Sequence, residues 1–216
     1  MTSPQTEAAA SPSRRQAAIV AGHTGDSTTA RQFLADADAK VRAAALGALA
    51  RLDVLTPDEL NAAVGDESPT VRRRAASVGA HLACSRQYEL LADDDPSVVE
   101  VAAWACGERE ADTKAVVLLI AIGTDHDDPL CREAAVAALG ALGDPAGLDT
   151  ILAGCSDKPA IRRRAVLALA PFEGPEVDAA LIAATEDRDW QTRQAAETLL
   201  RPPMAGDEDA DADNQI

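Results

Sequence analysis

The sequence predicts an all-α protein: a right-handed α–α superhelix, or solenoid, of about six and a half helix pairs. Alanine is the most frequent residue and only five of the 216 residues are aromatic, which favours many thin, closely packed helices over one large core. Strands are rich in β-branched and aromatic residues, so the composition argues against a β-sandwich or barrel. In addition, one motif returns about every 30 residues, as in a repeat protein.

The repeated motif marks the second helix of each unit. It contains a polar turn, an apolar anchor, an arginine and an alanine-rich run. Apolar residues stand at the anchor Val41 and 4, 5, 8 and 11 residues beyond it, which is the spacing of one helix face. The slot after the anchor recurs at intervals of 27 to 33 residues, and it holds Arg15, Arg42, Arg72, Val99, Arg132, Arg162 and Arg193.

A shorter helix precedes each second helix after the truncated first unit. The predicted ranges are 28–35, 57–64, 85–92, 112–123, 145–154 and 175–184. Pro57, Pro145 and Pro175 stand at or near three of their starts, where a missing N–H costs little. Asp, Ser or Pro before each second helix supplies an N-cap or a first-turn proline. Each unit is therefore expected to be a helix pair whose small alanines allow close packing.

The aspartate, the arginine six residues later and the alanine-rich helix resemble the HEAT repeat in its short bacterial form, over residues 12–201. The resemblance implies a hydrogen-bonded ladder between successive repeats. Its matching residues are Asp36 with Arg42, Asp66 with Arg72, and Asp187 with Arg193. Repeat three keeps Asp93 without the arginine, and later aspartate positions hold His126 and Ser156, beside Asp127 and Asp157. We therefore expect a ladder that is interrupted in the middle.

The two ends of the chain lie outside the repeats. Residues 1–11 and the acidic segment 202–216 lack the apolar content to order themselves, so we expect disordered tails. The net charge is −16, and five acids lie in the last ten residues. Such a charge repels phosphate backbones and favours a soluble monomer. We expect no duplex nucleic acid as partner, and no membrane, because no apolar run approaches the roughly 18 residues of a span.

Residues that could support catalysis are scattered. His23, His81 and His126 lie in different units, and none belongs to the His-Glu pairs with which HEAT-like deoxyhypusine hydroxylases bind iron. His126-Asp127-Asp128 could contribute metal ligands, but a solvated loop is the simpler interpretation. Gly-rich phosphate loops, nucleophile elbows and HExxH motifs are absent from the sequence, and its four cysteines form no CxxC pair. We expect no metal, no cofactor and reduced thiols in the cytoplasm.

Arginines gather at the starts of the second helices, which line the concave face of HEAT solenoids. The triplets 72–74 and 162–164 exceed what a ladder needs, and arginine forks suit carboxylates and phosphates. Two interpretations remain open: ladder residues with local ion pairs, or a binding surface. Trp104 is either an exposed hot-spot anchor or packs against helix 112–123. The candidate binding residues are Arg72, Arg73, Arg74, Val99, Trp104, Arg132, Arg162 and Arg163.

These observations predict a non-catalytic scaffold of the bacterial cytoplasm that binds an acidic or amphipathic protein segment on its concave face. The alternative is a HEAT-like enzyme relative with a concave active site. Alkylpurine DNA glycosylases use Trp, Asp and a basic lining, to which Trp104, Trp190 and nearby acids correspond. Bilin lyases also use short HEAT-like repeats. We further expect the acidic C-terminal segment to compete with the partner for the arginines.

Overall fold

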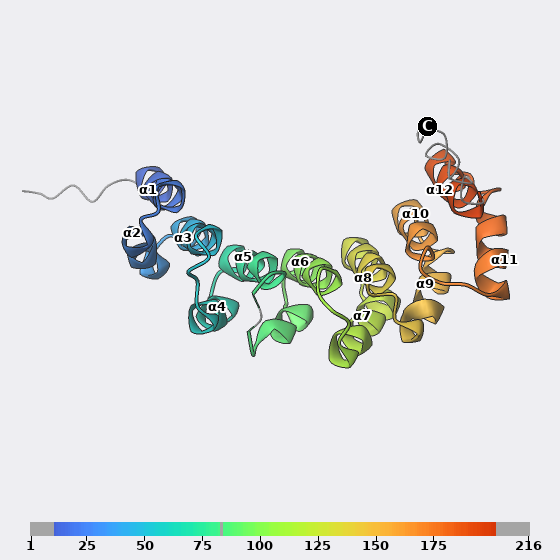
Figure 1. Cartoon of the computed structure of the whole chain (residues 1–216), viewed down its shortest axis with the longest axis horizontal. Coiled ribbons are helices and arrows are strands. Elements are labelled where there is room, and N and C mark those ends of the chain that lie inside the picture. Colours follow the sequence, from blue (N-terminus) through green and yellow to red (C-terminus); the bar gives the residue numbers. More distant parts are fainter. Residues whose placement is uncertain (1–10, 83, 202–216) are drawn as a thin grey trace, which may run out of the picture.

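The computed structural model describes residues 11–82 and 84–201, and over these ranges the chain is built of helices joined by short turns. It contains twelve α-helices and three short 3₁₀-helices within the described residues. The expected tails lie outside the described ranges, except for Ser11, which is the first residue of a helix. The helix pairs stack along one direction into a curved solenoid (Figure 1), as the sequence predicts.

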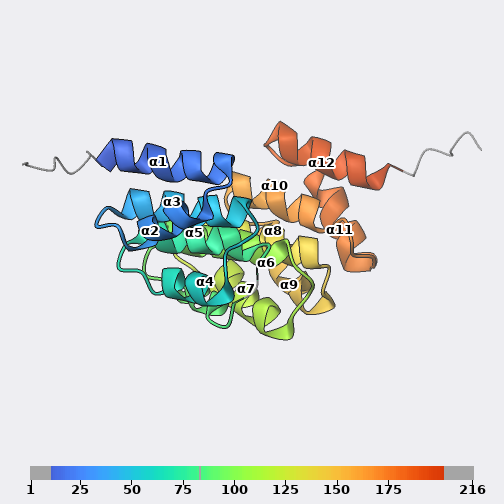
Figure 2. The ribbon, with the colours of Figure 1, turned by 60° about the vertical axis from the view of Figure 1, so that its left-hand side comes forward.

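The second helices of the pairs form the concave side of the solenoid (Figure 1). Successive second helices lie alongside one another in the stack (Figure 2). Their bounds are α1 (Ser11–Thr24), α3 (Ala39–Arg51), α5 (Pro69–Gly79), α6 (Pro96–Gly107), α8 (Pro129–Leu142), α10 (Pro159–Ala168) and α12 (Trp190–Leu200). Among the described residues, no helix combines the length and the apolar character that crossing a bilayer requires.

The first helices are shorter and form the convex side (Figure 1). They are α2 (Ser27–Gln32) with η1 (Phe33–Ala35), α4 (Pro57–Val64), η2 (Gln87–Ala92), α7 (Thr113–Asp125), η3 (Pro145–Gly147) with α9 (Leu148–Gly154), and α11 (Pro175–Ala184). These bounds agree with the predicted ranges within about two residues. The third repeat differs, because the segment predicted as a helix over 85–92 is a 3₁₀-helix that begins at Gln87.

Aspartates begin most of the second helices. The carboxylates of Asp38, Asp95 and Asp128 accept hydrogen bonds from the backbone N–H two residues later, and thereby cap α3, α6 and α8. Proline occupies the first turn of α6 and α8, where no intrahelical donor is lost. The helix starts predicted from the repeated turn are therefore set by local hydrogen bonds.

The core is a continuous layer of small and medium apolar side chains between the two rows of helices. In α3 the predicted stripe is buried at Val41, Ala45, Leu46 and Leu49, all of which have no exposed surface. Leu52, also predicted for this stripe, is half-buried, because the helix ends at Arg51 and Leu52 is its C-cap. Alanine supplies much of the layer, so neighbouring helices approach closely.

Glycine permits the closest contact between second helices. A Cβ built on Gly140 of α8 would lie 2.6 Å from the Cα of Ala168 in α10, a distance that real Cβ atoms do not show. Gly143, at the end of α8, has a φ of 62° and accepts the left-handed conformation that ends the helix. Gly140 therefore serves helix packing, and Gly143 serves the turn.

Candidate binding groove

Arginines and aspartates link successive repeats through side-chain ion pairs. The Nε and Nη2 atoms of Arg42 donate to the two carboxylate oxygens of Asp66 in the next repeat, at 2.8 and 2.7 Å. The Nη1 atom of Arg42 donates to the backbone oxygen of Asp36 in its own repeat, at 2.9 Å. Equivalent rungs, with shortest distances of 2.6 to 2.8 Å, are Arg14–Asp36, Arg72–Asp93, Arg132–Asp157 and Arg162–Asp187.

The ion pairs correct the pairing inferred from the resemblance. Within one repeat, Arg42, Arg72 and Arg193 donate to the main-chain oxygens of Asp36, Asp66 and Asp187, not to their carboxylates. The carboxylate points to the arginine of the preceding repeat because its oxygen also accepts from the backbone N–H two residues later, which orients it. The ladder therefore joins the arginine of one repeat to the aspartate carboxylate of the next repeat, whereas the sequence motif paired an aspartate and an arginine of the same repeat.

The ladder register also differs at two positions. Arg14 makes the first rung with Asp36, whereas Arg15, which the sequence placed in the arginine slot, is exposed on the concave side. In repeat five the rung uses Asp157 in place of Ser156. The backbone oxygen of Asp157 also accepts from the Nη1 atom of Arg162 in its own repeat, at 3.0 Å.

The predicted interruption is confined to one rung. Val99 stands at the arginine position and is 1% exposed, so it is a core residue and not part of a binding surface, contrary to the prediction. His126 stands at the matching aspartate position, and its Nδ1 atom accepts from the backbone N–H of Asp128 at 3.0 Å, as the aspartates do elsewhere. Both partners of this rung are therefore replaced together.

The two arginine triplets have different surroundings. Arg72, Arg132 and Arg162 are rungs of the ladder and are held by aspartates. Arg163 donates to the side-chain oxygen of Gln191, and Arg164 lies 3.7 Å from Glu133. In the triplet 72–74, by contrast, Arg73 and Arg74 are exposed and have no ion pair among the described residues.

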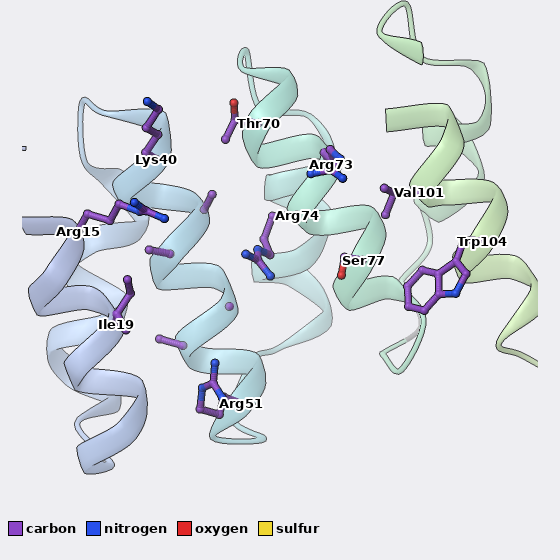
Figure 3. A pocket seen from close by; sticks show the side chains of 14 residues that line it. Arg15, Ile19, Lys40, Arg51, Thr70, Arg73, Arg74, Ser77, Val101 and Trp104 are labelled. Atoms are coloured by element: carbon purple, nitrogen blue, oxygen red, sulfur yellow. The ribbon is translucent and has the colours of Figure 1, made fainter. Parts of the chain in front are cut away.

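A groove of about 790 Å³ lies on the concave face over α1, α3, α5 and α6 (Figure 3). Its fourteen lining residues include five cations and no carboxylate, histidine or cysteine. None of these cations forms an ion pair within 4.0 Å in the part of the chain that the structure describes. They are Arg15, Lys40, Arg51, Arg73 and Arg74. The groove is therefore a concentration of uncompensated positive charge in a protein with a net charge of −16.

Small residues of α3 form the floor of the groove. Ala43, Ala44 and Gly47 line it, and a Cβ on Gly47 would lie 3.6 Å from the guanidinium carbon of Arg74. Because α3 presents no large side chain here, Arg74 of the next repeat extends across it (Figure 3). The cations of three neighbouring helices consequently face one shared space.

Trp104 closes the groove at its α6 end, as Figure 3 shows. Its side chain is 44% exposed, which agrees with an exposed position more than with one packed under helix α7. Val101, one turn earlier, lines the same end in place of the predicted Val99. Sequence reasoning missed Lys40 and Arg51 altogether. They could have been found from the sequence, since both stand in residues 39–51, a stretch of the second helix that contains no acid.

Cysteine chemistry is suppressed by burial. Burial raises the pKa of Cys106, Cys131 and Cys155 to about 11, so these thiols stay protonated at neutral pH and are weak nucleophiles. Cys131 is fully buried and donates to the backbone oxygen of Pro96 at 3.2 Å, as expected of a small core residue. Over residues 11–82 and 84–201, no three His, Cys, Asp or Glu side chains converge as metal ligands.

The stacked helix pairs and their ladder define an α-solenoid of short helical repeats. HEAT repeats match residues 56–140, 84–159 and 118–201, which together cover more than half of the chain. The chain belongs to the HEAT repeat family. A search of the curated proteins finds no match to the sequence.

Solved structures share the fold at low sequence identity. The X-ray structure of Escherichia coli YibA is 20% identical, with a TM-score of 0.64, over 90% of this chain and 80% of that one. Human deoxyhypusine hydroxylase in complex with glycerol is 19% identical, with a TM-score of 0.46, over 90% and 80%. A designed armadillo repeat protein in complex with the peptide (KR)4 is 16% identical, with a TM-score of 0.48, over 88% and 89%. At these identities, the similarity to YibA establishes the solenoid architecture and nothing further.

Proposed function

We propose that this protein is a non-catalytic scaffold that binds an acidic segment of a partner protein in the groove on its concave face. The observation that carries the proposal is the set of five cations that share the groove without a carboxylate. Four of the five are arginines, whose planar forks bind carboxylates in a bidentate manner. Fixed positive charge in a concave surface also attracts acidic ligands from a distance.

An acidic peptide suits the groove better than a duplex. A peptide presents a few carboxylates that fit a groove spanning four helices. A duplex would also place many phosphates close to the rest of the protein, which repels them because the net charge is −16. Acidic turns flank the second helices, for example Asp93-Asp94-Asp95 and Asp125-His126-Asp127. We place the protein, as a monomer with no cofactor, in the bacterial cytoplasm, where its buried thiols remain reduced.

An enzyme of the glycosylase or bilin-lyase type is the weaker alternative. A glycosylase of this kind combines Trp with an aspartate in its concave site. Trp104 lines the groove, but the fourteen lining residues include no carboxylate to accompany it. The groove therefore offers charge for binding and lacks a group for acid–base work.

The proposal is tested by charge reversal with a matched control. A fluorescein-labelled peptide of five glutamates between Gly-Ser ends is titrated at low salt, with anisotropy as the readout. R73E/R74E should weaken binding at least about tenfold, because the groove loses two of its five cations and gains two like charges. R163E/R164E changes the net charge equally at the same repeat position but outside the groove, and should leave binding within about twofold. Equal losses in both variants, or tighter Arg73-dependent binding of a labelled DNA duplex, would overturn the proposal.

A further inference from the structure

The repeat register extends the concave face beyond Trp104. Gly47, Ser77 and Trp104 occupy the same position in successive second helices, six residues after the anchor, and all three line the groove. Ala137 of α8 and Leu167 of α10 hold that position in the next two repeats. Because these helices stack in one row (Figure 1), Ala137 and Leu167 continue the same face.

This continuation is apolar at the position that Trp104 holds. The side chains of Trp104 and Leu167 are each 44% exposed, and Ala137 between them is half-buried. Glu133 forms an ion pair with Arg164 at 3.7 Å. Glu100, one turn before Trp104, and Arg163, one turn before Leu167, form no ion pair among the described residues. We call Trp104, Ala137 and Leu167 the apolar surface. It gives the concave face a cationic half over α1, α3 and α5, and an apolar half over α6, α8 and α10.

The distance between neighbouring helices determines how many peptide residues separate the groups that contact them. Neighbouring packed helices lie about 10 Å apart, and an extended chain advances about 3.3 Å per residue. A peptide crossing the face needs about three residues from the cations of α5 to Trp104 of α6. It needs about six more to reach Leu167 of α10, two helices further on.

We propose that the partner segment carries an acidic cluster and, on one side of it, two large apolar residues about three and about nine positions away. This inference rests on the proposed function and specifies the ligand of the same groove. The acidic cluster binds Arg73, Arg74 and their neighbours, and the apolar residues cover Trp104 and Leu167. A purely acidic ligand would leave both exposed side chains uncovered, whereas this one buries them.

Synthetic peptides test the inference directly. The probe is a labelled peptide of five glutamates, with leucines three and nine residues after the last one in a Gly-Ser background. A second peptide carries the leucines before the glutamates, and a third has serine in place of both. The protein is the full chain with Trp190→Phe, which leaves Trp104 as its one tryptophan. One leucine peptide should bind at least about tenfold tighter than the serine peptide and shift the emission of Trp104.

Variants distinguish binding at the apolar surface from nonspecific hydrophobic binding. Leu167→Ser should remove most of the advantage of leucine over serine without changing the affinity for the serine peptide, because Leu167 lies outside the groove. Trp104→Ala, made in the chain that keeps Trp190, should also remove most of that advantage, measured as the ratio of its own affinities for the two peptides. Ile182→Ser is the matched control, because Ile182 is 60% exposed on α11 at the convex side, and it should keep that advantage.

The outcomes distinguish the two proposals. If the serine peptide binds in an Arg73-dependent manner and leucine adds nothing, the apolar surface has no role and this inference is wrong, while the proposed function stands. The same holds if the leucine advantage survives both Trp104→Ala and Leu167→Ser. If no peptide binds in an Arg73-dependent manner, the proposed function fails and this inference fails with it.

Discussion

The guanidinium of Arg42 binds the carboxylate of Asp66, 24 residues away in the next repeat, through two hydrogen bonds of 2.8 and 2.7 Å. The same group also donates to the backbone oxygens of Asp36 and Ala37. One arginine therefore fixes the turn before its own helix and the turn of the following repeat. Because both ends of this contact are charged and largely buried, it holds the stacking register of the solenoid.

Removing this rung should destabilise the protein. Arg42→Ala leaves the Asp66 carboxylate, 15% exposed, without its main counter-charge, and should lower the free energy of unfolding by about 3 kcal/mol. Glu89→Ala is the control, because it removes only the exposed ion pair with Arg86, and it should cost less than about 1 kcal/mol. Urea unfolding followed by circular dichroism measures both. Equal losses would show that the ladder contributes no more than a surface ion pair.

The missing rung can be restored as a test of the register. Val99→Arg alone places a charge in the core and should be strongly destabilising. His126→Asp supplies the carboxylate and retains an acceptor for the backbone N–H of Asp128. The double variant should recover part of the loss, with a coupling free energy of about 1–3 kcal/mol in a double-mutant cycle. Additive effects would mean that these two positions do not face each other as a rung.

The sequence predicts local structure well here because the repeats encode it locally. The helix starts follow from turn residues such as Asp38 and Asp128, and the core stripe follows from the spacing after Val41. The predicted ladder pairs were wrong by one repeat. The motif places an aspartate and an arginine six residues apart, but it does not indicate whether the arginine binds the backbone oxygen or the carboxylate of that aspartate. A backbone oxygen and a carboxylate of the same residue serve two different arginines, as at Asp66.

The groove was only partly predictable for a related reason. Arg72-Arg73-Arg74 and Arg162-Arg163-Arg164 are the same in sequence, but their neighbours one repeat away differ. Glu133 and Gln191 engage the second triplet, whereas alanines of α3 face the first. Whether an arginine is free therefore depends on residues about 30 positions away. The difference becomes visible in the sequence when residues at the same position of adjacent repeats are compared.

Close helix packing predicts opposite effects for two glycines. Gly140→Ala brings a Cβ within 2.6 Å of the Ala168 backbone, so α8 and α10 must move apart, at a cost of about 1–3 kcal/mol. Gly79→Ala introduces a Cβ that meets nothing within 4 Å, so it should stabilise α5 by up to about 1 kcal/mol. Thermal unfolding of both variants checks the signs. A neutral Gly140→Ala would show that the two helices separate at no cost.

Acid should weaken the ladder in a defined range of pH. The hydrogen bonds from Arg162 lower the pKa of Asp187 to about 2, and arginine hydrogen bonds also lower the pKa of Asp36 and Asp93. A carboxylate with a lowered folded-state pKa stabilises the protein above its unfolded pKa of about 3.9, and that contribution is lost as the pH falls toward 2. The melting temperature should therefore drop between pH 4 and 2. Asp187→Asn should flatten this drop; an unchanged pH profile would remove Asp187 from the ladder's acid response.

The acidic segment 202–216 lies outside the described residues, and its competition for the groove stays a prediction. It carries five carboxylates between positions 207 and 213, followed by Ile216 three residues later, which is the spacing proposed for the partner's first apolar residue. Deleting residues 202–216 should tighten binding of the five-glutamate peptide about threefold at low salt, and the gain should vanish at 0.5 M salt, where screening is nearly complete. A variant with these five acids replaced by Asn or Gln keeps the length of the segment and should behave like the deletion. Binding that is equally tight in all three proteins at low salt would mean that the segment and the groove do not interact.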